Sequence, residues 1–420
     1  MRKNHASKPS KNKEIDAMKM LTRGRRPLAV SSVAVSVLAL TSGMLATPSQ
    51  AAPATGSPIK VGVLTDMTGA FGLVGKSNKA VAQFTIDEIN KSGGVLGHKL
   101  VMDLADGGSD PAIATQAASR LVNQDHVAMV VGGVASFTRV AVRNVIATRG
   151  KTIYVWPASY EGNECTENVW NTGSAPNQQV DPTVKYLLAQ GKKTFFLAGS
   201  DYLYPRNILA RVRQDVIAGG GSIVGEEYVP LDMTDASNLT SKVVAAKADA
   251  LFEVVVLPGT APFIKGVVDA GYKGTIAGTL FDEGINPLIG TQAQGLIGVQ
   301  DYYGPIKDTF SQSEVAKFNA QHPEAKGLFT STFNAPAWYR SIYLWKAAVE
   351  KAGSFDTVKV NKAMDSVSLA KSIGGPVGFA PGTKHLKLSM YLGQSNGDGS
   401  ETVLKSLGQI TPFQCATATN

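Results

Sequence analysis

The sequence predicts an α/β protein with two doubly wound lobes, each a mostly parallel sheet covered by helices on both faces. Three observations favour this class. The chain has 420 residues, too many for one ordinary domain, and its hydrophobic content of 44% suffices for two packed cores. Apolar runs of strand length alternate with amphipathic stretches of helix length. This alternation begins a second time near residue 175, which favours two sheets over one giant sheet.

The formal net charge of +8 comes from the start of the chain. Residues 1–51 hold nine of the 41 Lys and Arg residues but only two of the 33 Asp and Glu residues, which leaves 32 basic and 31 acidic residues in the remainder. A nearly neutral remainder argues against a polyanion-binding protein.

The same segment has the organisation of an export signal. A cationic stretch ends at Arg26, an uncharged segment runs from Leu28 to Leu45, and small residues stand at Ser49 and Ala51. We therefore predict a cleavable signal peptide over residues 1–51 and a soluble periplasmic product, since no cysteine near the cleavage site provides for a lipid anchor. The alternative is a retained membrane anchor, because 18 uncharged residues nearly span a bilayer.

The first half of the remaining chain alternates strand and helix signals. The helix expected over Lys76–Asn90 has apolar residues at spacings of three and four and ends at Gly93. Asp110 and Pro111 are typical of an N-cap and first-turn proline, and they predict the start of the next helix. The strands expected here are Ile59–Leu64, Leu100–Ala105 and Val127–Val131.

The second half repeats this alternation. A long helix is expected over Ala335–Lys351, after Gly304 and Pro305. The other expected helices are Gln179–Ala189, Asn207–Ile217 and Pro262–Asp269. The expected strands are Thr194–Ala198, Ile223–Val229, Leu251–Leu257 and Thr275–Leu280, with strand-like pieces at Val377–Phe379 and Leu386–Leu392. Because open parallel sheets bind ligands at the carboxyl ends of their strands, a ligand is expected in the cleft between the lobes.

The sequence lacks the patterns of catalytic and cofactor-binding residues. Near Gly75 and Lys76 the spacing misses that of a phosphate-binding loop, since Ala70 stands where the loop requires its first glycine. No dinucleotide fingerprint or nucleophile elbow is found in the sequence. The five histidines are scattered singly, without the spacing of a helical metal site. We predict a protein that is not an enzyme and has no cofactor or metal.

The two cysteines of the chain, Cys165 and Cys415, both follow the predicted signal peptide. An oxidising compartment permits a disulfide between them. The alternative is two separate buried thiols, since nothing local in the sequence brings them together.

Two sequence blocks resemble the type I periplasmic binding proteins of the branched-chain amino acid family. They are Glu88–Leu100, with the sequence EINKSGGVLGHKL, and Asp106–Pro111, with the sequence DGGSDP. The resemblance covers essentially all of the chain after the leader, and it implies two Rossmann-like lobes joined by crossover hinge strands. The lobes are expected to comprise residues 58–174 with about 304–370, and residues 175–303 with about 371–412.

Four further blocks resemble the urea-binding and short-chain amide-binding branch of this family. The most specific is Ser200–Arg206, with the sequence SDYLYPR, and the others are Tyr160–Gly162, Thr172–Gln179 and Gly225–Leu231. The chain departs from that branch at Trp156–Ser159, where the branch tends to have Tyr-Pro-Thr or Tyr-Pro-Val. We therefore expect a reshaped pocket wall.

The resemblance implies ligand contacts after the strands Val127–Val131, Thr152–Trp156 and Thr275–Leu280. The implied ligand-binding residues are Ser136, Phe137, Thr138, Trp156, Ala158, Tyr160, Tyr202, Tyr204 and Asp282. A hydroxyl at Ser136 and backbone amides near Ala158 suit a ligand oxygen. Tyr202 and Tyr204 supply aromatic walls, and they share a face if the backbone is extended there. The alternatives are an N-cap role for Ser136 and core packing for the two tyrosines.

The environment of Asp282 is expected to distinguish between ligand classes. An amino acid brings an ammonium group, and burying it without a partner costs several kcal/mol, so its site needs an acid. Asp282 or Glu283 could supply that acid, and both could instead simply open a short helix. If Asp282 points elsewhere, a neutral ligand such as urea or a small amide is favoured.

The predicted function is the extracytoplasmic solute-binding component of an ABC import system. It is expected to bind urea or a short-chain amide by hinge closure and to deliver it to membrane permease subunits, with candidate hinges near Gly173, Gly304 and Gly374. The alternatives are a branched-chain or other amino acid as the ligand, and an amide-sensing regulatory binding protein. Neither nucleic acid nor, after cleavage, the membrane is an expected partner.

Overall fold

The computed structural model describes residues 54–413 and residue 415. The predicted signal peptide, residues 1–51, and its cleavage site lie outside these residues. Among the described residues, no helix is both long enough and apolar enough to cross a membrane.

The first sheet is parallel and has the strand order β2-β1-β3-β4-β5. Its strands are β1 (Gly56–Thr65), β2 (His98–Asp106), β3 (Met129–Gly132), β4 (Ile153–Trp156) and β5 (Val169–Asn171). The helices of this part are α1 (Gly72–Lys91), α2 (Pro111–Asn123), α3 (Ser136–Arg143), α9 (Thr309–Gln321), α10 (Ala335–Ala352) and α11 (Thr357–Met364). A π-helical stretch, η1 (Asn144–Arg149), continues α3, and a 3-10 turn, η3 (Pro323–Ala325), follows α9.

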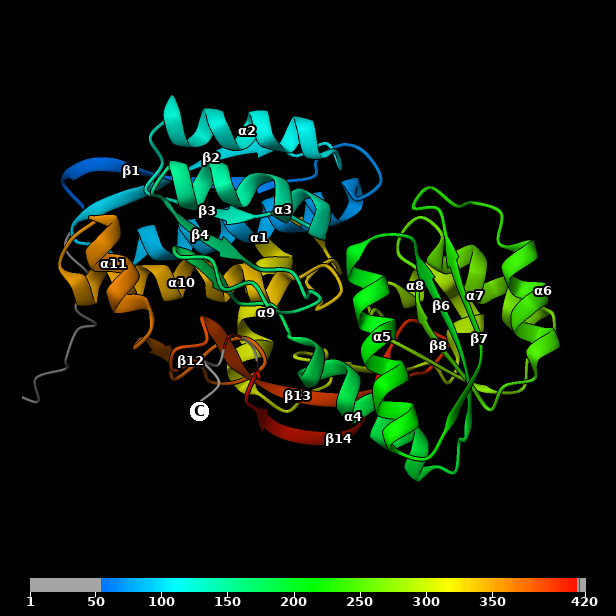
Figure 1. Cartoon of the computed structure of the whole chain (residues 1–420). Coiled ribbons are helices and arrows are strands. Elements are labelled where there is room, and N and C mark those ends of the chain that lie inside the picture. The colour runs from blue at the N-terminus through cyan, green and yellow to red at the C-terminus, as the bar shows by residue number, and fades with distance from the viewer. Residues whose placement is uncertain (1–53, 414, 416–420) are drawn as a thin grey trace, which may run out of the picture. The chain divides into compact units, whose positions relative to one another are not determined.

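Helices cover both faces of this sheet, with α2 and α3 on one side and α1 and α10 on the other (Figure 1). The period of two along β1 explains how both faces are filled. Val61 and Val63 pack against the side of α1 and α10, whereas Leu64 packs against α2 and α3. The predicted cap is confirmed, because the Asp110 carboxylate accepts from the backbone N–H groups of Ala112 (2.8 Å) and Ile113 (2.9 Å).

The second sheet is also parallel and has the strand order β10-β9-β8-β6-β7. Its strands are β6 (Thr194–Ser200), β7 (Ser222–Val229), β8 (Ala250–Val254), β9 (Thr275–Gly278) and β10 (Ile297–Gln300). The helices are α4 (Pro176–Ala189), α5 (Leu203–Ala218), α6 (Ser237–Ala246), α7 (Thr260–Asp269) and α8 (Asn286–Ile289), followed by a 3-10 turn, η2 (Gly290–Ala293). Phe195 and Leu197 pack toward α4 and α5, and Phe196 and Ala198 pack toward α6 and α7.

One long strand, β13 (His385–Ser395), takes part in both sheets. It pairs with β5 only through His385 and Asn171, and it pairs antiparallel with β10 along Tyr391–Gln394. The remaining strands attach to it as β11 (Ser368–Leu369), β12 (Val377–Ala380) and β14 (Glu401–Ile410). The predicted fold class is confirmed. The two sheets are not separate, however, because the 11 residues of β13 are enough to pair with strands of both sheets and make one continuous strand order. The boundaries of the two lobes stay a prediction.

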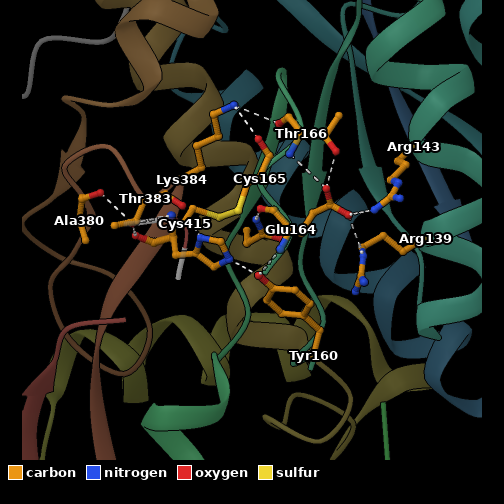
Figure 2. The surroundings of a disulfide bond; sticks show 12 residues. Arg139, Arg143, Tyr160, Glu164, Cys165, Thr166, Ala380, Thr383, Lys384 and Cys415 are labelled. Carbon is orange, nitrogen blue, oxygen red and sulfur yellow. Dashed lines mark hydrogen bonds and ion pairs between the residues drawn. A yellow bond between two sulfur atoms is a disulfide. The ribbon is translucent and has the colours of Figure 1, made fainter. Parts of the chain in front are cut away.

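A disulfide joins Cys165, in the loop between β4 and β5, to Cys415 near the end of the chain, with the Cα atoms 5.6 Å apart (Figure 2). Of the two alternatives for the cysteines, the structure therefore has the bridged one. The Asn177 side chain at the start of α4 also holds this segment, since its Nδ2 donates to the Thr411 carbonyl (2.9 Å).

Candidate functional site

A small pocket lies at the carboxyl ends of strands from both sheets. The first sheet contributes Val134 after β3 and Ala158 after β4, and the second contributes Tyr202 after β6, Val256 after β8 and Thr279 after β9. Its volume is about 60 Å³, whereas one water needs roughly 10–15 Å³. The pocket therefore has room for a small molecule, at the edge of the sheets where the sequence predicted a ligand.

Three of the nine predicted ligand-binding residues line this pocket, namely Ala158, Tyr202 and Tyr204. The tyrosine rings lie with their centroids 6.4 Å apart, and the Tyr204 hydroxyl donates to Thr279 Oγ1 (2.9 Å). The expectation of an extended backbone at both tyrosines is wrong for Tyr204. Because α5 begins at Leu203, Tyr202 is its extended N-cap residue and Tyr204 lies in its first turn.

Phe137 and Trp156 lie behind the pocket wall. The Phe137 ring packs edge-on against Tyr202, with the centroids 5.7 Å apart. Trp156 is fully buried and packs in the core toward α2 and α3. Neither residue lines the pocket, and direct contact of Phe137 or Trp156 with a ligand stays a prediction.

Ser136, Thr138 and Tyr160 have partners other than a ligand. Ser136 is the first residue of α3, not its N-cap, and its hydroxyl donates to Glu161 (2.5 Å). The Thr138 hydroxyl donates to the Ala135 carbonyl (2.6 Å). None of the three lines the pocket, because each is part of the packing between α3 and the loop after β4.

A buried ionic network around Arg139 extends through Glu164 toward the disulfide (Figure 2). The Arg139 guanidinium binds Glu161 (2.5 Å) and Glu164 (3.3 Å), and it lies 4.8 Å from the centroid of the Tyr160 ring. Tyr160 hydrogen-bonds to Nε2 of His385, whose burial lowers its pKa to about 4 and keeps the ring neutral at physiological pH. This network fixes the loop that carries Ala158.

Asp282 is not among the residues that line the pocket. Its two oxygens accept from the backbone N–H groups of Thr332 (2.6 Å) and Gly284 (2.8 Å), and burial raises its pKa to about 6. Neighbouring Glu283 accepts from the Gly304 N–H (2.8 Å). Both carboxylate oxygens are therefore engaged by the backbone, and contact of Asp282 with a ligand stays a prediction. Its carboxylate fastens the Thr332 backbone, which forms part of the pocket wall.

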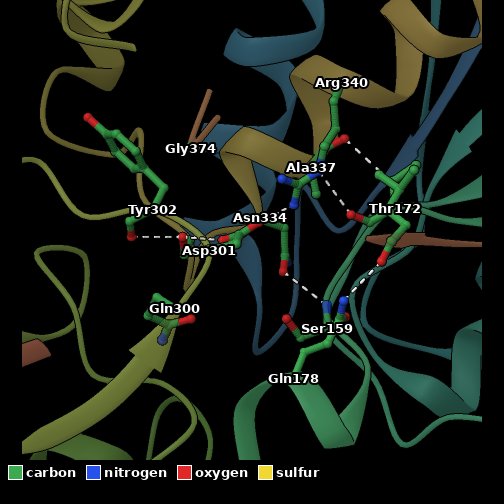
Figure 3. A network of polar contacts seen from close by, with 12 residues as sticks. Ser159, Thr172, Gln178, Gln300, Asp301, Tyr302, Asn334, Ala337, Arg340 and Gly374 are labelled. Carbon is green, nitrogen blue, oxygen red and sulfur yellow. Dashed lines mark hydrogen bonds and ion pairs between the residues drawn. The ribbon is translucent and has the colours of Figure 1, made fainter. Parts of the chain in front are cut away.

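The pocket also contains polar residues that the sequence did not single out, chiefly Ser159 and Asn334 (Figure 3). Asn334 precedes α10 in the left-handed backbone region (φ 61°), which asparagine tolerates better than most residues. In the sequence, the only feature that could have singled out Asn334 is its place just before Ala335 and Pro336, where the long predicted helix begins. In the described part of the chain, no three side chains of His, Cys, Asp or Glu are grouped as a metal site requires.

A buried glutamate in β8 predicts a pH dependence of stability. Glu253 accepts from the Val255 N–H (2.9 Å) through one oxygen, while the other finds no partner among the described residues. Burial raises its pKa to about 8 from 4.5. Between these values the folded protein holds a proton that the unfolded chain releases, so the free energy of unfolding falls as the pH rises, by at most about 1.4 kcal/mol per pH unit.

The isosteric E253Q variant should lose this contribution, so its stability should fall less between pH 5 and pH 8. Denaturant titrations at several pH values measure the slope. The exposed Glu350 provides a control, E350Q, whose slope should match the wild type. Equal slopes for E253Q and wild type would show that Glu253 is not protonated in the folded state.

Comparisons with known proteins agree with this architecture. A family model described as "Periplasmic binding protein" matches residues 58–400. The Leu/Ile/Val-binding protein BraC3 of Rhizobium johnstonii is 28% identical over 312 residues, which cover 72% of this chain and 82% of the relative. The Leu/Ile/Val-binding protein homolog 3 of Brucella melitensis is 28% identical over 344 residues, which cover 79% of this chain and 88% of the relative.

Solved structures show the same fold. A solute-binding protein of an ABC transporter from R. palustris, in complex with benzoate, has a TM-score of 0.77 and 19% identity, covering 86% of this chain and 99% of that one. The branched-chain amino acid transporter substrate-binding protein LivJ from Streptococcus pneumoniae, in complex with isoleucine, has a TM-score of 0.73 and 19% identity, covering 84% of this chain and 100% of that one. At this identity, the likeness concerns the fold alone.

Proposed function

Because the chain belongs to the family of periplasmic binding proteins, we propose that it is the extracytoplasmic solute-binding component of an ABC import system. It is a binding protein and not an enzyme. The observation that carries the proposal is the pocket at the carboxyl ends of strands from both sheets, a position suited to enclosing a ligand between them. The signal peptide predicted over residues 1–51 would export it to the periplasm.

A branched-chain amino acid is the ligand that the comparisons favour. The curated relatives are named for leucine, isoleucine and valine. The aliphatic side chains of these amino acids suit the apolar part of the wall, which includes Val74, Val256 and Ile285.

A short-chain amide is the second candidate, and the pocket chemistry favours it. Within the described part of the chain, the pocket is lined by no Asp, Glu, Lys, Arg or His side chain. An ammonium group would thus lack a partner, whereas a neutral amide needs none. Urea is neutral but lacks the apolar body that this wall would bury. An amide-sensing regulator would bind the same ligand class, and substrate uptake by cells lacking the gene separates it from an importer component.

We further propose that the protein closes on its ligand by a hinge motion. Support comes from the crossovers between the sheets, which meet at one place. Asp301 follows β10, and its carbonyl oxygen lies only 2.2 Å from the position that a Cβ atom on residue Gly374 would occupy. Arg340 of α10 binds both Asp301 and the carbonyl of Thr172, after β5. Scattering should show a smaller radius of gyration with saturating ligand, and an unchanged radius would contradict closure.

A ligand panel tests the binding function. A ligand at about one hundred times its dissociation constant should raise the free energy of unfolding by about 2.7 kcal/mol. We expect stabilisation by at least one of leucine, valine, isobutyramide, acetamide, urea and benzoate. V134W should block the pocket and abolish this effect, whereas V224W, at an exposed position of β7, should retain it. Equal stabilisation of wild type and V134W would place binding elsewhere, and no stabilisation of wild type would contradict the proposed ligands.

A further inference from the structure

The pocket has a polar end and an apolar end. Ser159, Ser331 and Asn334 line the pocket and also line a narrow gap beside Arg340 that has no room for a water molecule. Most of the remaining wall is aromatic or aliphatic, with residues such as Phe71, Val74, Tyr202, Val256, Leu257 and Ile285. This division suits a ligand with one polar group and an apolar body.

Most polar side chains of this wall already have a partner. The Ser331 hydroxyl donates to Asp301 (2.5 Å), and the hydroxyl of Thr332 donates to the Leu280 carbonyl (2.7 Å). Gln300 is also engaged, since its Nε2 donates to the Thr279 carbonyl (3.0 Å). These groups shape the wall, and donating the hydroxyl hydrogen of Ser331 or Thr332 to a ligand would break an existing hydrogen bond.

Ser159 and Asn334 differ from these neighbours. Within the described residues, neither the Ser159 hydroxyl nor Nδ2 of Asn334 has a hydrogen-bond partner, although both residues line the pocket. Asn334 stands at the N-cap position of α10 but makes no side-chain cap there, because its Oδ1 accepts from the Ser159 N–H (3.4 Å). Figure 3 shows the Asn334 side chain directed at Ser159. Two unused donor groups, the Ser159 hydroxyl and Asn334 Nδ2, thus belong to neighbouring residues of the pocket wall.

The charged groups around this end are neutralised by one another or by the backbone. Arg340 is fully buried and binds Asp301 and the Thr172 carbonyl (3.0 Å). Asp282 is fully buried and accepts from two backbone N–H groups. A ligand charge of either sign would therefore be buried without a counterion, which costs several kcal/mol.

We propose that Ser159 and Asn334 determine specificity by donating hydrogen bonds to a carbonyl oxygen of an uncharged ligand with an apolar body. This inference rests on the proposed function, because it concerns the ligand of the same pocket. A carboxamide or ketone accepts from both donors without bringing a charge. A carboxylate of the same shape is the related alternative that the experiment distinguishes.

Ligands that share one apolar body but differ in charge provide the test. Isovaleramide is neutral, isovalerate is an anion and leucine is a zwitterion, and all three carry the same isobutyl group. Titration calorimetry on the wild-type chain should give a dissociation constant for the amide about tenfold or more below those of the charged ligands.

Variants then test whether Ser159 and Asn334 bind the polar group of the ligand. S159A removes the hydroxyl, N334G removes the carboxamide while preserving the left-handed backbone, and N334D keeps the shape but loses the two donors. Each should weaken isovaleramide binding about five- to tenfold. The exposed Ser241 and Asn123 provide matched controls, S241A and N123D, which should bind as the wild type does.

Tighter binding of leucine or isovalerate than of isovaleramide would overturn the uncharged ligand and leave the proposed function standing. Dissociation constants of S159A and N334G within twofold of the wild type would overturn the two specificity residues. If the wild type binds none of the three ligands and none of the earlier panel, the proposed ligand classes fail together with this inference.

Discussion

Replacement of Arg340 by methionine is expected to lower the free energy of unfolding by about 3–5 kcal/mol. Arg340 is only 1% exposed, and its guanidinium binds the buried Asp301 carboxylate and the Thr172 carbonyl. Without it, Asp301 keeps the Ser331 hydroxyl as a donor but has no positive partner. A buried carboxylate without a positive partner costs more than the lost hydrogen bonds alone.

The double variant R340M/D301L separates the charge from the packing. Replacing both partners by apolar residues of similar shape removes the uncompensated carboxylate, so the double variant should recover most of the lost stability. Denaturant titration of wild type, both single variants and the double variant closes a thermodynamic cycle. A double variant as unstable as R340M would show that packing, and not the unpaired charge, causes the loss.

Much of the fold could be predicted because its signals are local. The cap at Asp110 and Pro111 marks the start of α2, and Gly93 follows the end of α1. The missed elements lack such signals. β10 has only four residues, and β14 lies mostly exposed at an edge, so neither has a long alternation of apolar and polar residues. The link through β13 depends on pairing between distant segments, which no local pattern encodes.

The site was predicted less well because its residues come from several loops. The position of the pocket followed from the parallel sheets, and the aromatic wall followed from Tyr202 and Tyr204. The sequence did not show which way each candidate side chain points. Ser136 and Asp282 have residue types that suit a ligand, but Glu161 and the Thr332 N–H engage them. These partners are 25 and 50 residues away in sequence, so only the folded chain shows the competition.

Removal of the disulfide is expected to lower the free energy of unfolding by about 2–4 kcal/mol. The bridge between Cys165 and Cys415 spans 250 residues, and a cross-link of that length strongly restricts the unfolded chain. In the folded protein it fastens the end of the chain to the loop after β4. There Lys384 Nζ also donates to the Thr166 carbonyl (3.0 Å).

The double variant C165S/C415S and reduction of the wild type should therefore have the same effect. Denaturant titration with and without a thiol reductant measures both, and the reductant should not change the variant. The comparison separates the cross-link from the side chains, because the reduced wild type keeps both cysteines. If the variant were destabilised while reduction changed little, the loss of stability would come from the local contacts of the cysteine side chains. Restriction of the unfolded chain by the cross-link would then not be its cause. If neither treatment changed the unfolding midpoint, the other contacts of the segment, including the Asn177 hydrogen bond to Thr411, would suffice to hold it.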